Sequence, residues 1–222
     1  TKKIDKNEII NLSTKGLNLI LFSSIPITIF LIFFSDELIT IVFQRGSFTE
    51  TDTQIVSNSL IFYSIGIIGV GTVGLFTKIF FSLRKPKTPM FVGFFTVILN
   101  ILLNITLIKQ LGYIGLPLAT SLTSLLSGIL LFYLLRNINI ITFGDFSNSL
   151  TKCLVSSLIS LASVSIILYL VRIFINPDTY FFVLILFPLF FIIYFIISFF
   201  FKLDPAINLF SYLKKKIYFN KL

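Results

Sequence analysis

Three polar side chains stand inside otherwise apolar stretches of this sequence. Asn100 and Asn104 interrupt the apolar run 90–108, and Thr120 follows soon after a glycine-containing turn at 111–115. Residues four apart share one face of a helix, so the two amides are expected to lie together. Because the turn is short, the flanking helices should be antiparallel neighbours, which brings Thr120 towards the amides. An unpaired amide in hydrocarbon is costly, so these side chains must find partners.

The sequence offers little that could perform catalysis. It contains no His, and its acidic residues fall near or outside the ends of the apolar runs. It has no paired carboxylates, no serine–histidine arrangement and no phosphate-binding loop. An intramembrane protease or glycosyltransferase would need at least one such group for acid–base or nucleophilic catalysis. The sequence therefore predicts a protein that is not an enzyme and has no catalytic residues.

Membrane helices must position these polar residues. The chain has 222 residues, a mean hydropathy of +1.00, 56% hydrophobic residues and only 12% charged residues. Uncharged runs of about 20 residues are long enough to cross a bilayer as helices. Six such runs predict an all-α polytopic membrane protein with spans at roughly 17–35, 55–83, 89–108, 113–135, 150–173 and 180–201. Because the chain begins with Thr1 and shows no signal peptide, we expect a fragment of a longer protein.

The distribution of the net charge of +9 favours a topology signal over nucleic-acid binding. Most of the 18 basic residues fall at the termini and in alternate loops, at Lys2, Lys3, Lys6, Lys15, Lys78, Arg84, Lys85, Lys87, Arg136, Lys152, Lys202, Lys214, Lys215, Lys216 and Lys221. The remaining loops carry only Arg45, Lys109 and Arg172. Since loops rich in Lys and Arg stay in the cytoplasm, both termini are expected there. The positive charge would then contact membrane lipids rather than nucleic acid.

The sequence divides into five segments. The polar stretch 1–16 is expected to lie along the cytoplasmic surface or to link to other sequence. Residues 17–136 hold four spans, a cytoplasmic loop follows at 137–149, and 150–202 adds a further helix pair. The tail 203–222 carries apolar residues at helical spacing beside the lysines at 214–216, which suits an amphipathic helix on an anionic leaflet.

The loop after the first span and the helix that follows it carry recognisable local signals. Thr49 followed by Asp52 predicts a capping box that starts the second membrane helix. Arg45 could bind a phosphate, but pairing with Glu50 or Asp52, or a place among lipid headgroups, is favoured. Lys78 lies near the cytoplasmic end of the second span, where it can either reach the interface or face a cavity and help to hold an anionic headgroup.

A distinctive run of residues occupies the same loop, Phe43-x-Arg45-Gly46-x-Phe48-Thr49-x-x-Asp52-Thr53. Other short motifs accompany it, namely Pro26, Tyr63-x-x-Gly66, Lys87-Thr88-Pro89, Asn100 and Gly112-x-x-Gly115-Leu116-x-Leu118-Ala119-Thr120-Ser121. Together they resemble the C-terminal half of the MurJ (MviN) family of lipid II flippases, within the MOP exporter superfamily. The six predicted helices would form the second lobe of such a transporter. The chain departs from the family at Lys85, where an acidic residue is often found.

This resemblance implies a transporter of the bacterial cytoplasmic (inner) membrane. It would move lipid II, an undecaprenyl-linked peptidoglycan precursor, between leaflets by alternating access. Its partners would be lipid II, membrane lipids and the N-terminal lobe of the same protein, which these residues lack. The last two helices would border a groove for the polyprenyl tail. The alternatives are a polysaccharide or multidrug exporter of the same superfamily, and a membrane scaffold fragment that transports nothing.

The resemblance also implies a cation site. Some members bind sodium between the two helices of this hairpin, and the matching positions are Asn100, Asn104, the carbonyl of Leu116 and Thr120. The second of these positions is acidic in the sodium-binding pattern, whereas Asn104 is neutral. Because hard cations prefer anionic oxygens, affinity for sodium should fall or vanish. Hydrogen bonds between helices are the alternative role of these residues, and no other cofactor is expected.

Overall fold

Helices make up all the regular structure in the described part of the chain. The computed structural model describes residues 6–175 and 179–219. Its elements are α1 (Lys6–Phe33), α2 (Ser35–Phe43), α3 (Glu50–Ser82), α4 (Lys87–Leu111), the 3₁₀ turn η1 (Gly112–Ile114), α5 (Gly115–Asn137), α6 (Phe143–Ile175), α7 (Thr179–Phe200) and α8 (Asp204–Phe219).

Six of these helices correspond to the predicted spans. The apolar segments long enough to cross a membrane are Lys6–Phe33, Glu50–Ser82, Lys87–Asn137, Phe146–Val171 and Phe182–Phe200. The third is 51 residues long and folds back at η1 into α4 and α5. Gly112 permits this turn, because its φ of 61° with ψ of −137° is a backbone conformation that only glycine adopts without steric cost. The chain is thus an all-helical, multi-pass membrane protein, and the predicted fold class is confirmed.

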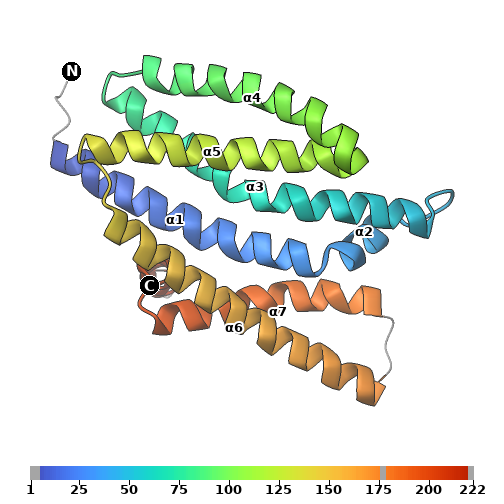
Figure 1. Cartoon of the computed structure of the whole chain (residues 1–222). Coiled ribbons are helices and arrows are strands. Elements are labelled where there is room, and N and C mark those ends of the chain that lie inside the picture. Colours follow the sequence, from blue (N-terminus) through green and yellow to red (C-terminus); the bar gives the residue numbers. More distant parts are fainter. Residues whose placement is uncertain (1–5, 176–178, 220–222) are drawn as a thin grey trace.

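Consecutive long helices run in opposite directions. In Figure 1 α4 and α5 lie at the top, α1 in the middle and α6 and α7 at the bottom. The hydroxyl of Thr28 in α1 donates to the carbonyl oxygen of Ser64 in α3 over 3.0 Å. Near the start of α1, Gly16 lies beside Leu75, towards the end of α3. The later residue of α1 thus contacts the earlier residue of α3, and the earlier residue of α1 contacts the later one, so the two helices are antiparallel.

The helix α1 joins the two halves of the bundle. On one side, Leu17 and Leu21 are fully buried in a core that includes Phe76 of α3. On the other side, Phe30 is fully buried, with its ring centroid 5.1 Å from Phe187 and 5.3 Å from the ring of Phe190, both in α7. Packing of this kind, rather than exclusion of water, holds helices together within a membrane.

The segment between α1 and α3 is a short helix and a capped turn. The apolar residues 38–43, expected at the interface or as a continuation of the first span, belong to the separate nine-residue helix α2. The Thr49 N–H donates to Asp52 Oδ2 over 2.8 Å, and the Asp52 N–H donates to Thr49 Oγ1 over 3.3 Å. The predicted capping box at the start of α3 is therefore confirmed.

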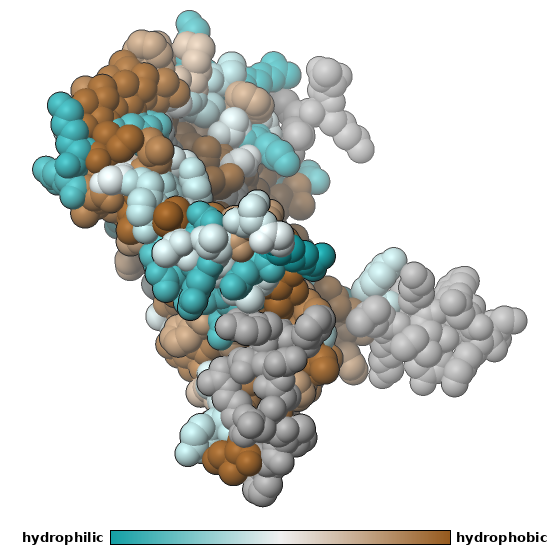
Figure 2. Space-filling view, turned by 90° about the vertical axis from the view of Figure 1, so that its right-hand side faces the viewer, coloured by the Kyte–Doolittle hydropathy of each residue, from teal (hydrophilic) through white to brown (hydrophobic). Residues whose placement is uncertain are grey.

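Charged residues lie at the ends of the bundle. Because the long helices alternate in direction, the starts of α1, α4 and α6 lie at the same end as the last residues of α3, α5 and α7 (Figure 1). This end gathers Lys15, Arg84, Lys87, Arg136 and Lys202. Figure 2 shows the opposite end, where hydrophilic residues gather in the middle of the face and also occur at its left and upper edges, beside hydrophobic residues. The two ends bracket an apolar belt, as expected of a protein that spans a bilayer.

The helices extend beyond the predicted spans. The first begins at Lys6, so much of the expected linker 1–16 continues α1. Helix α6, which contains the fifth predicted span, begins at Phe143. This shortens the expected loop 137–149 to a few residues after Asn137. Both extensions are polar, and a helix can continue into the headgroup region because its backbone hydrogen bonds are internal. The tail forms α8; the side chains of the lysines at 214–216 lie outside the described residues.

Candidate functional site

An open hollow lies between α3, α4 and α5. One part, of about 410 Å³, is lined by all three helices, and a neighbouring part of about 360 Å³ lies between α3 and α5. The two parts share Val70 of α3 and Thr120 and Ser124 of α5. Most of the wall is apolar, so the few polar side chains on it determine what it can bind.

Close packing of α3 against α5 forms the floor of this hollow. A Cβ built on Gly69 would lie 2.5 Å from the backbone carbonyl carbon of Ser124, and one on Gly66 would lie 3.0 Å from the Cα of Ser121. The hydroxyl of Ser121 donates to the carbonyl oxygen of Phe62 over 2.5 Å, and that of Ser124 donates to Gly66 over 3.2 Å. The glycines thus allow the two backbones to touch, which is the role that small residues have in membrane helix pairs.

A row of polar side chains runs along the contact between α4 and α5. We call it the polar seam and define it as Thr96, Asn100 and Asn104 of α4 with Thr120, Thr123 and Ser127 of α5. The hydroxyls of Thr96 and Ser127 share a hydrogen bond, and Asn100 Nδ2 donates to Thr123 Oγ1 over 3.1 Å. As positions increase along α4 they decrease along α5, so the two helices are antiparallel, as predicted from the short turn.

The predicted cation ligands form two hydrogen-bonded pairs, one on each helix of the hairpin. Asn104 Nδ2 donates to Asn100 Oδ1 over 3.0 Å, so the two amides do share one face of α4. Thr120 Oγ1 donates to the Leu116 carbonyl oxygen over 3.1 Å, within its own helix. Asn100 and Thr120 line the same part of the hollow, but no direct hydrogen bond joins them among the described residues.

One oxygen of the polar seam is left without a partner. Asn104 Oδ1 is buried and accepts no hydrogen bond from any described residue. A buried acceptor without a donor is destabilising, and it is also an available ligand for a cation. The oxygens nearby belong to neutral amides, hydroxyls and a backbone carbonyl. Among the described residues there is no group of three or more His, Cys, Asp or Glu side chains suited to a metal.

Thr123 is the member of the Asn100 hydrogen-bond network that the sequence did not single out. It is buried, accepts from Asn100, and donates to the carbonyl oxygen of Ala119 over 2.9 Å. It lies three residues after Thr120 and so shares its helix face. That spacing was a signal, but choosing between Thr120 and Thr123 requires the register of α4 against α5.

The two basic residues considered for a headgroup lie in different places. Lys78 is exposed on α3, and the exposed residues Val70 and Gly74 precede it at four-residue spacing, so it lies on the face that borders the hollow. Arg45 lies in the exposed turn after α2 and donates from Nη2 to the Ile41 carbonyl oxygen over 3.0 Å. Among the described residues no ion pair joins Arg45 to Glu50 or Asp52; its guanidinium instead serves a carbonyl at the end of α2, where the last carbonyls of a helix need donors.

Comparison with known proteins places this arrangement in a family. The family model described as lipid II flippase MurJ matches residues 1–201. A lipid II flippase MurJ of Thermosipho africanus (strain TCF52B) is 32% identical over 201 residues, which cover 90% of this chain and 39% of the relative. A probable lipid II flippase MurJ of Buchnera aphidicola subsp. Baizongia pistaciae (strain Bp) is 37% identical over 117 residues, covering 53% of this chain and 23% of the relative.

The solved structures lead to the same family. A structure of lipid II flippase MurJ in an inward closed conformation matches with a TM-score of 0.73 and 28% identity, covering 87% of this chain and 39% of that one. The chain thus spans at most about two fifths of the length of these relatives. The resemblance carried by the sequence motifs is confirmed: the chain belongs to the MurJ lipid II flippase family.

Proposed function

We propose that this chain is the C-terminal lobe of a lipid II flippase that works by alternating access in the bacterial cytoplasmic membrane. The observation that carries the proposal is the family match over residues 1–201, together with a fold shared with a lipid II flippase at a TM-score of 0.73. The proposed role is transport rather than catalysis. The rest of the transporter would supply the other lobe, since the chain covers 39% of the relative from Thermosipho africanus.

The open face formed by α3, α4 and α5 supports the proposal that a second lobe packs or moves against this chain. No described residue of α4 is buried, and many large apolar side chains on it are exposed, among them Phe91, Phe94 and Ile98. A face of this kind needs a cover of lipid or of another protein segment. In the proposed transporter the hollow would form one wall of the cavity between the lobes, and Lys78 on its border would attract an anionic headgroup.

The polar seam is where this chain would hold a sodium ion. The unpartnered Asn104 Oδ1 would provide one ligand, and the hydroxyl of Thr120, the carbonyl of Leu116 and the amide oxygen of Asn100 would provide the others. All four groups are neutral, and Asn100 Oδ1 already accepts from Asn104. We therefore propose at most weak sodium binding unless a carboxylate joins the set from another part of the protein.

Thermal unfolding in matched salts tests the sodium proposal. The wild-type protein and the Asn104→Asp variant would be melted in sodium chloride and in choline chloride at equal ionic strength. We expect a small sodium-dependent rise in melting temperature for the wild type and a larger rise for the variant, because the added carboxylate is an anionic oxygen ligand. Equal melting temperatures in both salts for both proteins would show that the seam serves packing alone.

Complementation tests the proposed function itself. The gene that encodes this chain, with whatever flanking sequence it carries, would be expressed in a bacterium depleted of its own lipid II flippase. Restored growth is the expected result. Residues 1–222 alone should not restore it, because alternating access needs two lobes that move against each other. Failure of the complete gene despite good insertion into the membrane would favour an exporter or a non-transporting scaffold.

A further inference from the structure

Two adjoining hollows lie at the basic end of the bundle, away from the hollow between α3, α4 and α5. One, of about 200 Å³, is bordered by α1, α6 and the turn between α7 and α8. The other, of about 380 Å³, lies between α1 and α8. Both are lined by Asn18 of α1 and Asp204 at the start of α8, so the hollows meet at this pair.

A hydrogen-bonded wall fixes the shape of both hollows. Asn18 is only 9% exposed; its Nδ2 donates to Asp204 Oδ2 over 3.4 Å, and its Oδ1 accepts from the Ser149 hydroxyl over 2.7 Å. These two bonds connect α1 to α8 and to α6, which are far apart in the sequence. The hollows are therefore formed by the fold itself and do not depend on one mobile side chain.

The smaller hollow is polar and carries positive charge. Lys152 of α6 and Lys202 of the α7–α8 turn line it, together with Thr14 and Asn148. Within the described residues, neither lysine ammonium has a hydrogen bond or an ion pair. Lys202 has a φ of 54°, a left-handed conformation that glycine adopts far more readily than other residues. Lysine is therefore present at a position where the backbone conformation alone would favour glycine.

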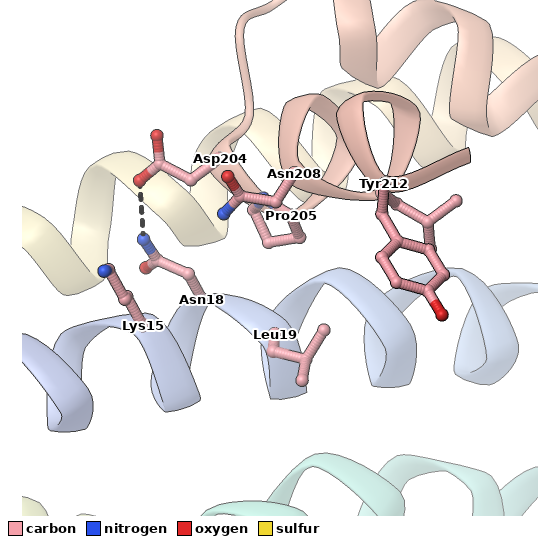
Figure 3. Close-up of a pocket in the computed structure, with 8 residues that line it drawn as sticks. Lys15, Asn18, Leu19, Asp204, Pro205, Asn208 and Tyr212 are labelled. Carbon is pink, nitrogen blue, oxygen red and sulfur yellow. Dashed lines mark hydrogen bonds between the residues drawn. The ribbon is translucent and has the colours of Figure 1, made fainter. Parts of the chain in front are cut away.

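The larger hollow is mostly apolar and is drawn in Figure 3. Leu19 of α1 and the side chains of Pro205, Leu209 and Tyr212 from α8 line it, and Lys15 lies at its border. In the figure α8 lies above α1, and the ring of Tyr212 points from α8 into the space between the two helices. The polar hollow, whose two lysines have no partner among the described residues, thus opens beside an apolar slot between α1 and α8.

We propose that this junction binds one anionic glycerophospholipid of the surrounding membrane. Its phosphate would lie between Lys152 and Lys202, and its glycerol backbone and the start of an acyl chain would lie in the slot between α1 and α8. The position agrees with this occupant, because Lys202 directly follows the apolar residues of α7 and so lies at the level where headgroups meet hydrocarbon. A soluble anion would use the lysines but not the slot.

The carboxylate of Asp204 restricts which headgroup fits. It repels phosphate, so the phosphate must lie on the lysine side of the polar hollow. It also has acceptor capacity beyond the single bond from Asn18, which a headgroup hydroxyl could use as a donor. A lipid with an anionic phosphate and a hydroxyl-bearing headgroup, such as phosphatidylglycerol, satisfies both requirements.

Native mass spectrometry of the protein, expressed as its gene encodes it, tests the polar half of the site. Phosphatidylglycerol would be titrated against the wild type, Lys202→Gln, Lys152→Gln and the control Lys109→Gln, which removes an exposed lysine from the last turn of α4. We expect each of the first two changes to weaken binding of one lipid roughly fivefold, and the control to have no effect. Phosphatidylcholine should bind more weakly than phosphatidylglycerol. Equal weakening by all three lysine changes would overturn the proposal, since the adducts would then reflect overall charge.

A second pair of variants tests the apolar half. Leu209 lines the slot, whereas Ile207 is a similarly exposed residue of α8 that does not line it. We expect Leu209→Gln to weaken phosphatidylglycerol binding at least about threefold and Ile207→Gln to leave it unchanged. Glycerol 3-phosphate, the headgroup without chains, should compete poorly. Competition by glycerol 3-phosphate as strong as that of the lipid would instead assign the lysines to a soluble anion. None of these readouts depends on flippase activity.

Discussion

Gly69 of α3 lies directly against the backbone of Ser124 in α5. A Cβ on Gly69 would come within 2.5 Å of the Ser124 carbonyl carbon and 2.6 Å of the Leu125 nitrogen. Backbone atoms cannot move aside as the end of a side chain can. The two helices that form the floor of the hollow are therefore joined at a point where a single methyl group does not fit.

The first prediction follows from this contact. Gly69→Ala should separate α3 from α5 and destabilise the protein by about 1–3 kcal/mol, despite the better helix propensity of alanine. The matched control is Gly74→Ala in the same helix, where an added Cβ meets nothing within 4 Å. Thermal unfolding in detergent would compare the two. A melting temperature for Gly69→Ala equal to that of Gly74→Ala would mean that the contact can relax.

The second prediction concerns the polar seam. Asn100→Ala removes the donor to Thr123 and the acceptor for Asn104, so it should cost roughly 0.6–1.7 kcal/mol of stability. Asn104→Leu should cost less, because it also removes the buried oxygen that has no partner. Thr106→Ala, an exposed residue of α4 that bonds only to its own helix, is the control. The order of the three melting temperatures is the readout; Asn104→Leu as the most damaging change would contradict this account.

The third prediction concerns the attachment of the last helix pair. Phe30 is fully buried among aromatic rings, so Phe30→Ala should leave a cavity between α1 and α7 and cost about 3–5 kcal/mol. Phe200→Ala provides the control, because Phe200 is 79% exposed at the end of α7. Limited proteolysis of the loop at 138–142 would report detachment of α6 and α7. If both variants are cut at the same rate, Phe30 does not hold the pair in place.

The sequence predicted the elements better than their contacts. Hydropathy located the six spans, and the local pair Thr49 and Asp52 revealed a capping box, since both signals lie within one helix. The acceptors of Asn100 and Arg45 could not be predicted, because they depend on the register of α4 against α5 and on where α2 ends. Helical periodicity shows which residues share a face, but not which residue of a neighbouring helix lies opposite.

The last prediction concerns orientation in the membrane. The basic helix ends gather at one end of the bundle, and the rule that positive loops stay inside then assigns this end to the cytoplasm. Two substitutions test the assignment: Ser47→Cys, exposed in the turn after α2, and Asn148→Cys, exposed near the start of α6. The native Cys153 is buried and should not interfere. A membrane-impermeant maleimide should label Ser47→Cys in intact spheroplasts and Asn148→Cys only after permeabilisation. The reverse pattern would invert the topology and would move the proposed lipid site to the outer leaflet.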